Sequence, residues 1–255
     1  MAQAAEVAGH AAENHGPMAQ FEIKRLVPME LFGYDISFTN SSLFMVLALL
    51  LVSAFLIFAM NGRSLVPTRI QSVAEGLYEF IAGIVRESLG EEGMRYFPWV
   101  FTIFIFIFAL NMLGMIPGSF TVTSHIIVTF ALALMVWVVA TLVGFARHGF
   151  GYLKLFVPEG VPMWLMPLIV PIEIVSYLIR PISLSVRLFA NMMAGHTMLK
   201  VFASFAVSLP IFAKAFPVLF TAAFTGLEFL VAALQAFIFA VLTCIYLNDA
   251  VNMHH

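Results

Sequence analysis

Long apolar runs separated by short polar segments dominate the chain from residue 43 onward. The runs at 43–60, 97–116 and 126–146 come close to the ~20 residues that a helix needs to cross a hydrocarbon core of about 30 Å. The first run stops at Asn61-Gly62-Arg63, which is typical of a helix end followed by positive charge. These three runs predict transmembrane helices.

The segment from Pro67 to Leu89 has a different, helical period. Apolar residues recur at steps of three and four, at Ile70, Val73, Leu77, Ile81 and Ile84. Charged residues occupy the other faces, at Arg69, Glu75, Glu79 and Arg86. One apolar stripe on an otherwise charged helix indicates an amphipathic helix at about 67–93 that lies in the membrane interface.

Two longer apolar runs follow, at 162–207 and 211–247, with Pro210 between them. As single helices they would measure about 65 and 55 Å, roughly twice the hydrocarbon thickness. They must therefore tilt, bend or break, and Pro167, Pro171 and Pro181 supply bend points. The pattern leaves open whether two long tilted helices or several shorter ones form.

The predicted fold is therefore an all-α integral membrane protein with about five membrane-embedded helices and one interfacial helix. The last two helices are expected to form a long, tilted, antiparallel hairpin at about 162–247. Residues 41–255 make a single membrane domain, and residues 1–40 a polar, loosely structured segment with a short helix near Phe21.

Composition supports a bilayer environment. Hydrophobic residues make up 62% of the chain and charged residues only 10%, against about 25% charged in soluble domains. The net charge of -2 with 12 Lys and Arg residues leaves no basic patch that could neutralise a run of phosphates, so nucleic-acid binding is excluded. The single cysteine, Cys244, is expected to be a structural thiol.

The distribution of basic residues predicts the orientation. The connection at 117–125 has no Lys or Arg, whereas the flanking segments do, at Arg63, Arg69, Arg86, Arg95, Arg147 and Lys154. By the positive-inside rule the basic segments face the cytoplasm, so the amino terminus is extracytoplasmic and the carboxyl terminus cytoplasmic. The first residues lack an apolar core and do not predict a cleavable signal peptide.

Charged and polar residues inside the two long runs are the candidate chemistry. One helix face carries residues spaced by seven and four, at Glu173, Arg180, Arg187 and Asn191, and the next run carries Glu228 and Gln235 seven apart. Residues that face each other in an antiparallel hairpin have a nearly constant index sum. The positions of Arg187 and Gln235 add up to 422, and half of 422 is 211, adjacent to Pro210.

The hairpin also brings titratable groups together. His196 and Glu228, whose positions add up to 424, should form a pair on one side of the midpoint. The sum of 422 places Asp249 opposite Glu173, where two acids would make a negative mouth. The alternative for Asp249 is a frayed, solvated terminal residue.

Each of these residues has a plainer interpretation. Arg180 and Lys200 can snorkel to the headgroups, and His196 can be a hydrogen-bonded bundle histidine. Glu228 can pair with a lysine or with His196, and single Asn or Gln residues often bond helices together. Arg187 lies deeper, where an arginine costs about 2.5 to 3.5 kcal/mol on insertion scales, so its presence indicates a function.

The charge balance of the hairpin points to another chain. Residues 162–247 contain four basic residues and two acids, namely Arg180, Arg187, Lys200 and Lys214 against Glu173 and Glu228. A missing carboxylate should come from a partner. Small residues near Arg187 would suit its close approach, although generic bundle packing explains them equally well; they are Ser183, Ala190, Ala194 and Gly195.

Two long motifs resemble a known family. The stretch PISLSVRLFANMMAGHTM at 181–198 resembles the RLFxNMxAG signature of F-type ATP synthase subunit a, and LEFLVAALQAFIFAVLTCIYL at 227–247 resembles its last-helix signature. NMLGMIPGSFTVTSH at 111–125 extends the similarity, and the order of His196 followed by Glu228 is similar to that of alphaproteobacterial and mitochondrial members. The resemblance implies the proton-translocating stator subunit of the membrane sector.

The resemblance also implies roles for individual residues. Arg187 matches the essential arginine that faces the carboxylates of the c-ring, and Asn191 and Gln235 match its polar neighbours. His196 and Glu228 match the pair that lines the outer half-channel, while Glu173 and Ser176 match the inner one. Asn111 stands where some relatives have an acid, so no proton-relay role is transferred to it.

The implied partners are the c-ring, the b-type subunits of the peripheral stalk, the remaining subunits of the complex, and membrane lipid. No cofactor or metal is implied, and without a GxxxxGK[ST] loop the nucleotide chemistry should reside in other subunits. A bacterial inner membrane is favoured over the mitochondrial one. The alternatives are a stand-alone proton-coupled secondary transporter that uses Glu173 and Glu228, and a purely structural membrane scaffold.

Overall fold

The computed structural model of the chain describes residues 21–28, 30–31, 34–35, 37–61, 67–116, 118–157, 162–210, 212 and 215–252. Most of the expected amino-terminal segment, the basic residue Arg63 and the hairpin residue Lys214 therefore lie outside the described residues.

The described part of the amino-terminal segment is more ordered than expected. It contains four short strands, β1 (Arg25–Val27), β2 (Glu30–Leu31), β3 (Tyr34–Asp35) and β4 (Phe38–Thr39). Strand β1 pairs antiparallel with β4, and β2 with β3. Asn40 fastens this arrangement, because its Oδ1 accepts a hydrogen bond from the Lys24 backbone N–H (3.2 Å) and its Nδ2 donates one to the Glu22 carbonyl (3.1 Å). The expected loose tail is thus wrong for the residues of these four strands.

Helices make up the rest of the described chain. They are α2 (Asn40–Met60), α3 (Arg69–Leu89), α4 (Phe97–Gly114), α5 (Ile126–His148), α6 (Met166–Ser208) and α7 (Ala215–Val251). Short 3₁₀ turns flank them, η2 (Glu91–Tyr96), η3 (Val122–Ser124) and η4 (Gly149–Phe156). Within the described ranges, five helices are long and apolar enough to cross a membrane, α2, α4, α5, α6 and α7. The predicted all-α membrane fold is confirmed.

The amphipathic helix α3 begins where the sequence supplies a cap. The Thr68 hydroxyl accepts a hydrogen bond from the Gln71 backbone N–H (3.3 Å), and Gly90 ends the helix with a φ of 72°, which favours glycine. Its buried face contains Ile81 and Val85. The predicted apolar stripe is only partly buried, because Ile70 and Val73 are exposed.

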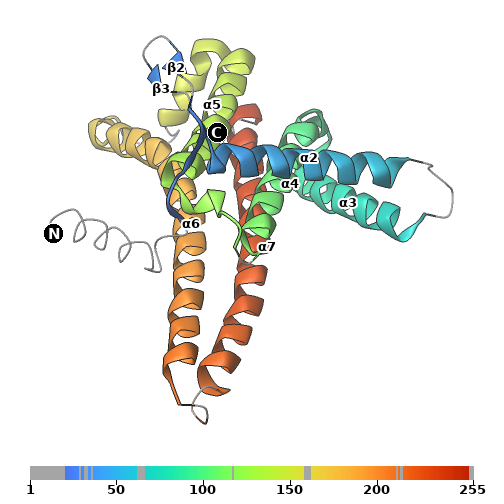
Figure 1. Ribbon diagram of the computed structural model, residues 1–255. Coiled ribbons are helices and arrows are strands. Elements are labelled where there is room, and N and C mark those ends of the chain that lie inside the picture. The colour runs from blue at the N-terminus through green and yellow to red at the C-terminus, as the bar shows by residue number, and fades with distance from the viewer. Residues whose placement is uncertain are drawn as a thin grey trace.

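Helices α6 and α7 run side by side as one long hairpin whose turn end projects beyond the other helices (Figure 1). They contain 43 and 37 residues, which resolves the question left open by the sequence in favour of two long continuous helices. Pro210 lies in the connection between them, as predicted. The opposite half of α7 packs against α3, α4 and α5, and its most buried large side chain there is Phe239.

A proline inside α6 is accommodated by a neighbouring helix. Pro181 has no N–H, so it leaves the carbonyl of Tyr177, four residues earlier, without its helical partner. The Trp137 indole N–H of α5 donates to that carbonyl at 3.2 Å. The helix therefore continues through the proline because α5 supplies the missing donor.

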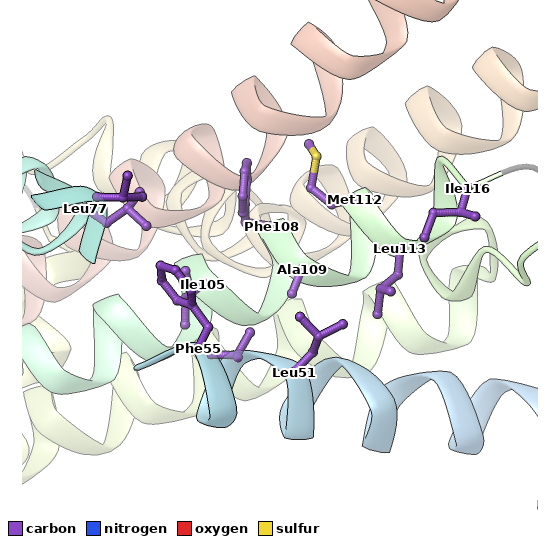
Figure 2. Close-up of a pocket in the computed structure, with 11 residues that line it drawn as sticks. Leu51, Phe55, Leu77, Ile105, Phe108, Ala109, Met112, Leu113 and Ile116 are labelled. Carbon is purple, nitrogen blue, oxygen red and sulfur yellow. The ribbon is translucent and has the colours of Figure 1, made fainter. Parts of the chain in front are cut away.

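Many of the exposed side chains of the helices are large and apolar. A groove of about 320 Å³ opens between α2, α3 and α4 and has an entirely apolar lining. Figure 2 shows Leu51 and Phe55 of α2, Leu77 of α3 and Phe108 of α4 around it. A face of this kind is compatible with lipid and not with water.

Candidate functional site

The face of α6 that carries Arg187 is exposed and built largely from small side chains. We call this face the exposed stripe; its members recur at three- and four-residue steps and are Ser183, Arg187, Ala190, Asn191, Ala194 and Met198. Residues at these steps share one side of a helix. None of the described residues covers the stripe.

Arg187 has no hydrogen bond or ion pair to any described residue. Its guanidinium carries a charge at any accessible pH and presents five donors in a planar fork. Such a group in an apolar helix run needs an acceptor from elsewhere, since an unpaired charge in the hydrocarbon region is costly. The exposed stripe therefore presents an unsatisfied cation to a neighbour.

A buried amide network supports the stripe from behind. Asn191 Nδ2 donates to Gln235 Oε1 at 2.9 Å, and the Gln235 side chain is fully buried on α7. Asn111 of α4 is also fully buried and donates from its Nδ2 to the Ala232 carbonyl at 3.1 Å. These bonds join α4, α7 and α6 one turn away from Arg187.

His196 and Glu228 form a buried titratable pair between α6 and α7. His196 Nε2 lies 3.4 Å from Glu228 Oε1, and the two side chains are only 10% and 4% exposed. The atoms are near enough for an ion pair when the imidazole is protonated, but they are not aligned as a hydrogen bond. Gly195 makes room for this contact, because a Cβ there would lie 2.7 Å from Glu228 Oε1.

The pair connects two cavities. His196 lines a cavity of about 310 Å³, which we call the hydroxyl cavity because Ser119, Thr221 and Thr225 contribute to its wall. Glu228 lines a second cavity of about 200 Å³ on the exposed stripe, the stripe cavity, together with Asn191. The contact between His196 and Glu228 is thus the polar link between a hydroxyl-lined space and the stripe.

A third polar group lies at the other end of the hairpin. Arg180 Nη1 contacts Asp249 Oδ2 at 2.7 Å, with about a third of each side chain exposed. The guanidinium carbon lies 5.5 Å from the Tyr177 ring centroid and 5.4 Å from that of Tyr246. Asp249 is thus ion-paired inside α7 and is not a frayed terminal residue.

Two side-chain bonds of the hairpin lie at larger index sums than the predicted 422. Gln235 contacts Asn191 instead of Arg187, and Asp249 contacts Arg180 instead of Glu173. Side chains on a helix lean toward its amino terminus. In an antiparallel hairpin the two leans add, so longer side chains meet at larger index sums than the backbone positions suggest.

The remaining predicted residues stand apart from these contacts. Glu173 is half-buried and Ser176 exposed, and neither has a hydrogen bond or ion pair with another described residue. Both lie on α6 before Arg180, on the side of Arg187 opposite His196. The structure therefore separates the predicted polar residues into two groups with Arg187 between them.

Several contacts escaped the sequence interpretation. The predicted index sum placed Asp249 opposite Glu173, so it did not suggest the pairing of Arg180 with Asp249. The only sequence signal for a donor to the Tyr177 carbonyl was the proline four residues later. The tyrosine hydroxyls of Tyr152 and Tyr177 lie 3.1 Å apart, with no local sequence signal at all. Among described residues, no cluster of three or more His, Cys, Asp or Glu side chains could hold a metal ion.

Comparison with known proteins identifies the family. The model of the family described as ATP synthase A chain matches residues 42–248. The chain is 55% identical over 240 residues to ATP synthase subunit a of Rhodospirillum rubrum, a match that covers 94% of this chain and 100% of the relative. It is 58% identical over 244 residues to ATP synthase subunit a of Rhizobium rhizogenes, covering 93% and 98%, and 57% identical over 245 residues to that of Rhizobium meliloti, covering 94% and 98%. The chain belongs to the ATP synthase A chain family.

Proposed function

We propose that this chain is the stationary proton-translocating subunit of an F-type ATP synthase, with two offset half-channels on either side of Arg187. The main support for this proposal is that Arg187, which has no ion pair with a described residue, lies on the exposed stripe beside the stripe cavity that Glu228 lines. The family supports this function, and the stand-alone transporter is not favoured, since the chain matches its relatives over 93% or more of its length.

The partner that meets Arg187 is a carboxylate on a helix of the c-ring. Small residues on the stripe, such as Ala190 and Ala194, permit close approach of that helix. The guanidinium favours the ionised carboxylate when it passes. Because the carboxylate crosses lipid only in its neutral form, it must take up a proton on one side of Arg187 and release it on the other.

The outer half-channel consists of the hydroxyl cavity, His196, Glu228 and the stripe cavity, in that order. A proton that reaches His196 passes to Glu228 over the 3.4 Å contact and from there to the c-ring. His196 follows Arg187 by nine positions on α6, about 14 Å along the axis. The entry site and the arginine are therefore distinct places on one helix.

The inner half-channel lies at the other end of α6, with Glu173 and Ser176 on its path. Glu173 precedes Arg187 by fourteen positions, about 21 Å. Arg180 and Asp249, held between Tyr177 and Tyr246, border the same end. Among the described residues, no hydrogen bond or ion pair joins the His196–Glu228 pair to the Glu173 end. Protons therefore cross only on the rotating carboxylates, where the field supplies about 2.3 kcal/mol per charge per 100 mV.

The finer assembly and location are part of the proposal. The partners are the c-ring and b-type subunits of the peripheral stalk, together with the other subunits of the complex. The chain resides in a bacterial inner membrane as one membrane domain, residues 41–255. Residues 1–40 lie outside the cytoplasm, α3 in the interface, and the end of α7 at the cytoplasmic side.

The test is substitution of Arg187 in the whole complex. Arg187→Ala and Arg187→Lys should abolish ATP-driven proton pumping in inverted membrane vesicles, measured by quenching of a pH-sensitive dye, because an ammonium lacks the planar fork. Native mass measurement of the extracted complex should show normal assembly. Arg86→Ala, on exposed α3, serves as the control and should pump normally. Normal pumping by assembled Arg187→Ala complexes would refute the proposal.

A further inference from the structure

The hydroxyl cavity has an unusual polar lining. It lies between the end of α4, the following connection, α6 and α7, and its polar side chains are Ser119, His196, Lys200, Thr221 and Thr225. Lys200 follows His196 by one helical turn and shares its face. A lysine in an apolar helix thus opens into the space from which His196 takes its protons.

The hydroxyl groups of this cavity are committed as donors elsewhere. Thr225 donates to the Thr221 carbonyl and Thr221 to the Pro217 carbonyl, both at 2.8 Å. Ser119 donates to the Leu113 carbonyl at 2.6 Å. Each oxygen is therefore left with lone pairs for the cavity. Neutral oxygens are ligands that hard metal cations accept.

The charges that face this cavity come from few elements. On α6 they are Lys200 and His196, and on α7 Glu228 approaches His196. The connection after α4 has no Asp, Glu, Lys or Arg among its described residues, and the His125 Nε2 contacts the Phe21 carbonyl at 2.9 Å. Lys200 has no hydrogen bond or ion pair with a described residue, so its ammonium remains available to the cavity's oxygens.

We propose that Lys200 determines ion specificity at this entrance: its tethered ammonium takes the place of a metal cation among the hydroxyl oxygens, so that Na⁺ is excluded while protons reach His196. This inference rests on the proposed function and adds a residue to it. An ammonium supplies one positive charge and three donors, which match the acceptors offered.

Lys200 discriminates between Na⁺ and protons because they enter differently. A metal ion needs a free set of oxygen ligands and brings a second full charge into a small, partly apolar space, where like charges repel strongly. A proton needs neither, since it moves along hydrogen bonds through water to the imidazole. Removing the ammonium should leave an oxygen-lined site for Na⁺ next to Glu228.

The experiment uses the whole ATP synthase in liposomes, with Lys200→Met compared with the original complex and with the charge-preserving Lys200→Arg. Proton transport is measured with either Na⁺ or choline, at equal ionic strength, in the compartment that the hydroxyl cavity faces. The original complex and Lys200→Arg should transport equally in both salts. Lys200→Met should transport about tenfold more slowly in Na⁺ than in choline. A ratio of this size corresponds to a Na⁺ concentration about ten times the dissociation constant of the vacated site.

Two further measurements separate this role from a structural one. Acidifying the same compartment should relieve the Na⁺ inhibition of Lys200→Met, because protons and Na⁺ compete. Adding Thr225→Val, which removes one oxygen ligand, should reduce the inhibition. If Lys200→Met does not assemble, Lys200→Gln takes its place.

Equal rates of the Lys200→Met complex in Na⁺ and choline would overturn the inference, and so would equal Na⁺ inhibition of Lys200→Arg. Both outcomes are judged by the ratio of rates in the two salts. Neither outcome contradicts the proposed function, because that proposal is tested separately by the substitution of Arg187.

Discussion

At the scale of single residues, the pair of His196 and Glu228 depends on a missing side chain. Gly195 has no Cβ, and the carboxylate of Glu228 occupies the space where one would be. The glycine lies inside a helix, so its backbone conformation does not explain its presence there. Its use is the close approach of a titratable group from α7.

Gly195→Ala should therefore impair proton transport without unfolding the chain. The new Cβ would lie 2.7 Å from Glu228 Oε1 and 3.0 Å from its Cδ, and the flexible carboxylate would swing away from His196. A misplaced proton-transfer group lowers rates by about ten- to a hundredfold. ATP-driven pumping in vesicles measures the loss, and native mass measurement checks the assembly.

Gly226→Ala is the matched control. It lies two residues before Glu228 on α7, and a Cβ there meets nothing within 4 Å. This variant should pump normally. Equal effects of the two glycine substitutions would show that helix propensity, and not the position of Glu228, is responsible.

The sequence was sufficient to single out most of these residues. Arg187, His196 and Glu228 could be found because charges inside long apolar runs are costly and therefore conspicuous. The cavities could not be found, since the stripe cavity arises between two helices and the hydroxyl cavity also needs the segment after α4, which is distant in sequence. Ser119 and Thr225, for example, are ordinary residues until the fold places them on one wall.

At the scale of elements, α6 continues through Pro181 while α5 supplies a donor to the carbonyl that the proline leaves without a helical partner. The sequence supplied the bend points but could not show which neighbour donates to the freed carbonyl of Tyr177. The long hairpin itself was predictable from two apolar runs around Pro210. Its side-chain register was not, because the lean of side chains toward each amino terminus shifts the contacts by different amounts for different residues.

Trp137→Phe should destabilise the chain by removing the donor at this proline. The Tyr177 carbonyl would then be buried without a partner, which costs about 1 to 3 kcal/mol. Thermal unfolding of the purified complex in detergent, followed through this subunit, measures the change.

Trp99→Phe offers a control with the same loss of ring volume. The Trp99 Nε1 is buried and has no hydrogen-bond partner in the described part of the chain, so its removal leaves no acceptor unsatisfied. The Trp137 variant should unfold at a clearly lower temperature than the Trp99 variant. Equal midpoints would mean that the bond to the Tyr177 carbonyl contributes nothing to stability.

At the scale of the whole molecule, the described helices form a bundle that leaves the exposed stripe of α6 uncovered, and this is the surface that we propose for a partner. The five apolar helices and the amphipathic α3 were predictable from hydrophobic period and length. Their packing around α7 was not, since every face is apolar and a pattern of uniformly apolar residues does not distinguish lipid-facing from buried sides. The exposed stripe is recognisable only when polarity, small size and exposure are considered together.

A large residue on the stripe should uncouple the complex while this chain still folds. Ala190→Leu adds volume one turn from Arg187, at a position that is exposed in the part of the chain that the structure describes. It should hold the partner helix away from the guanidinium, so ATP hydrolysis should continue while proton pumping falls about tenfold or more. The ratio of pumping to hydrolysis in vesicles is the measurement.

Ser53→Leu on α2 is the corresponding control, because Ser53 is also small and exposed but lies outside the stripe. It should leave the ratio unchanged. If Ala190→Leu pumps as well as Ser53→Leu, the stripe is not the surface that meets the c-ring.

The projecting hairpin of Figure 1 has a mechanical consequence. Its base is clamped by α3, α4 and α5, whereas its tip holds together mainly through stacked rings, with Phe202 5.7 Å from Phe220 and 5.3 Å from Phe224. The hairpin is therefore supported by other helices at its Asp249 end and projects toward Pro210. On the proposed function, we expect a rotor that pushes sideways against Arg187 to bend the projecting half, which also carries His196.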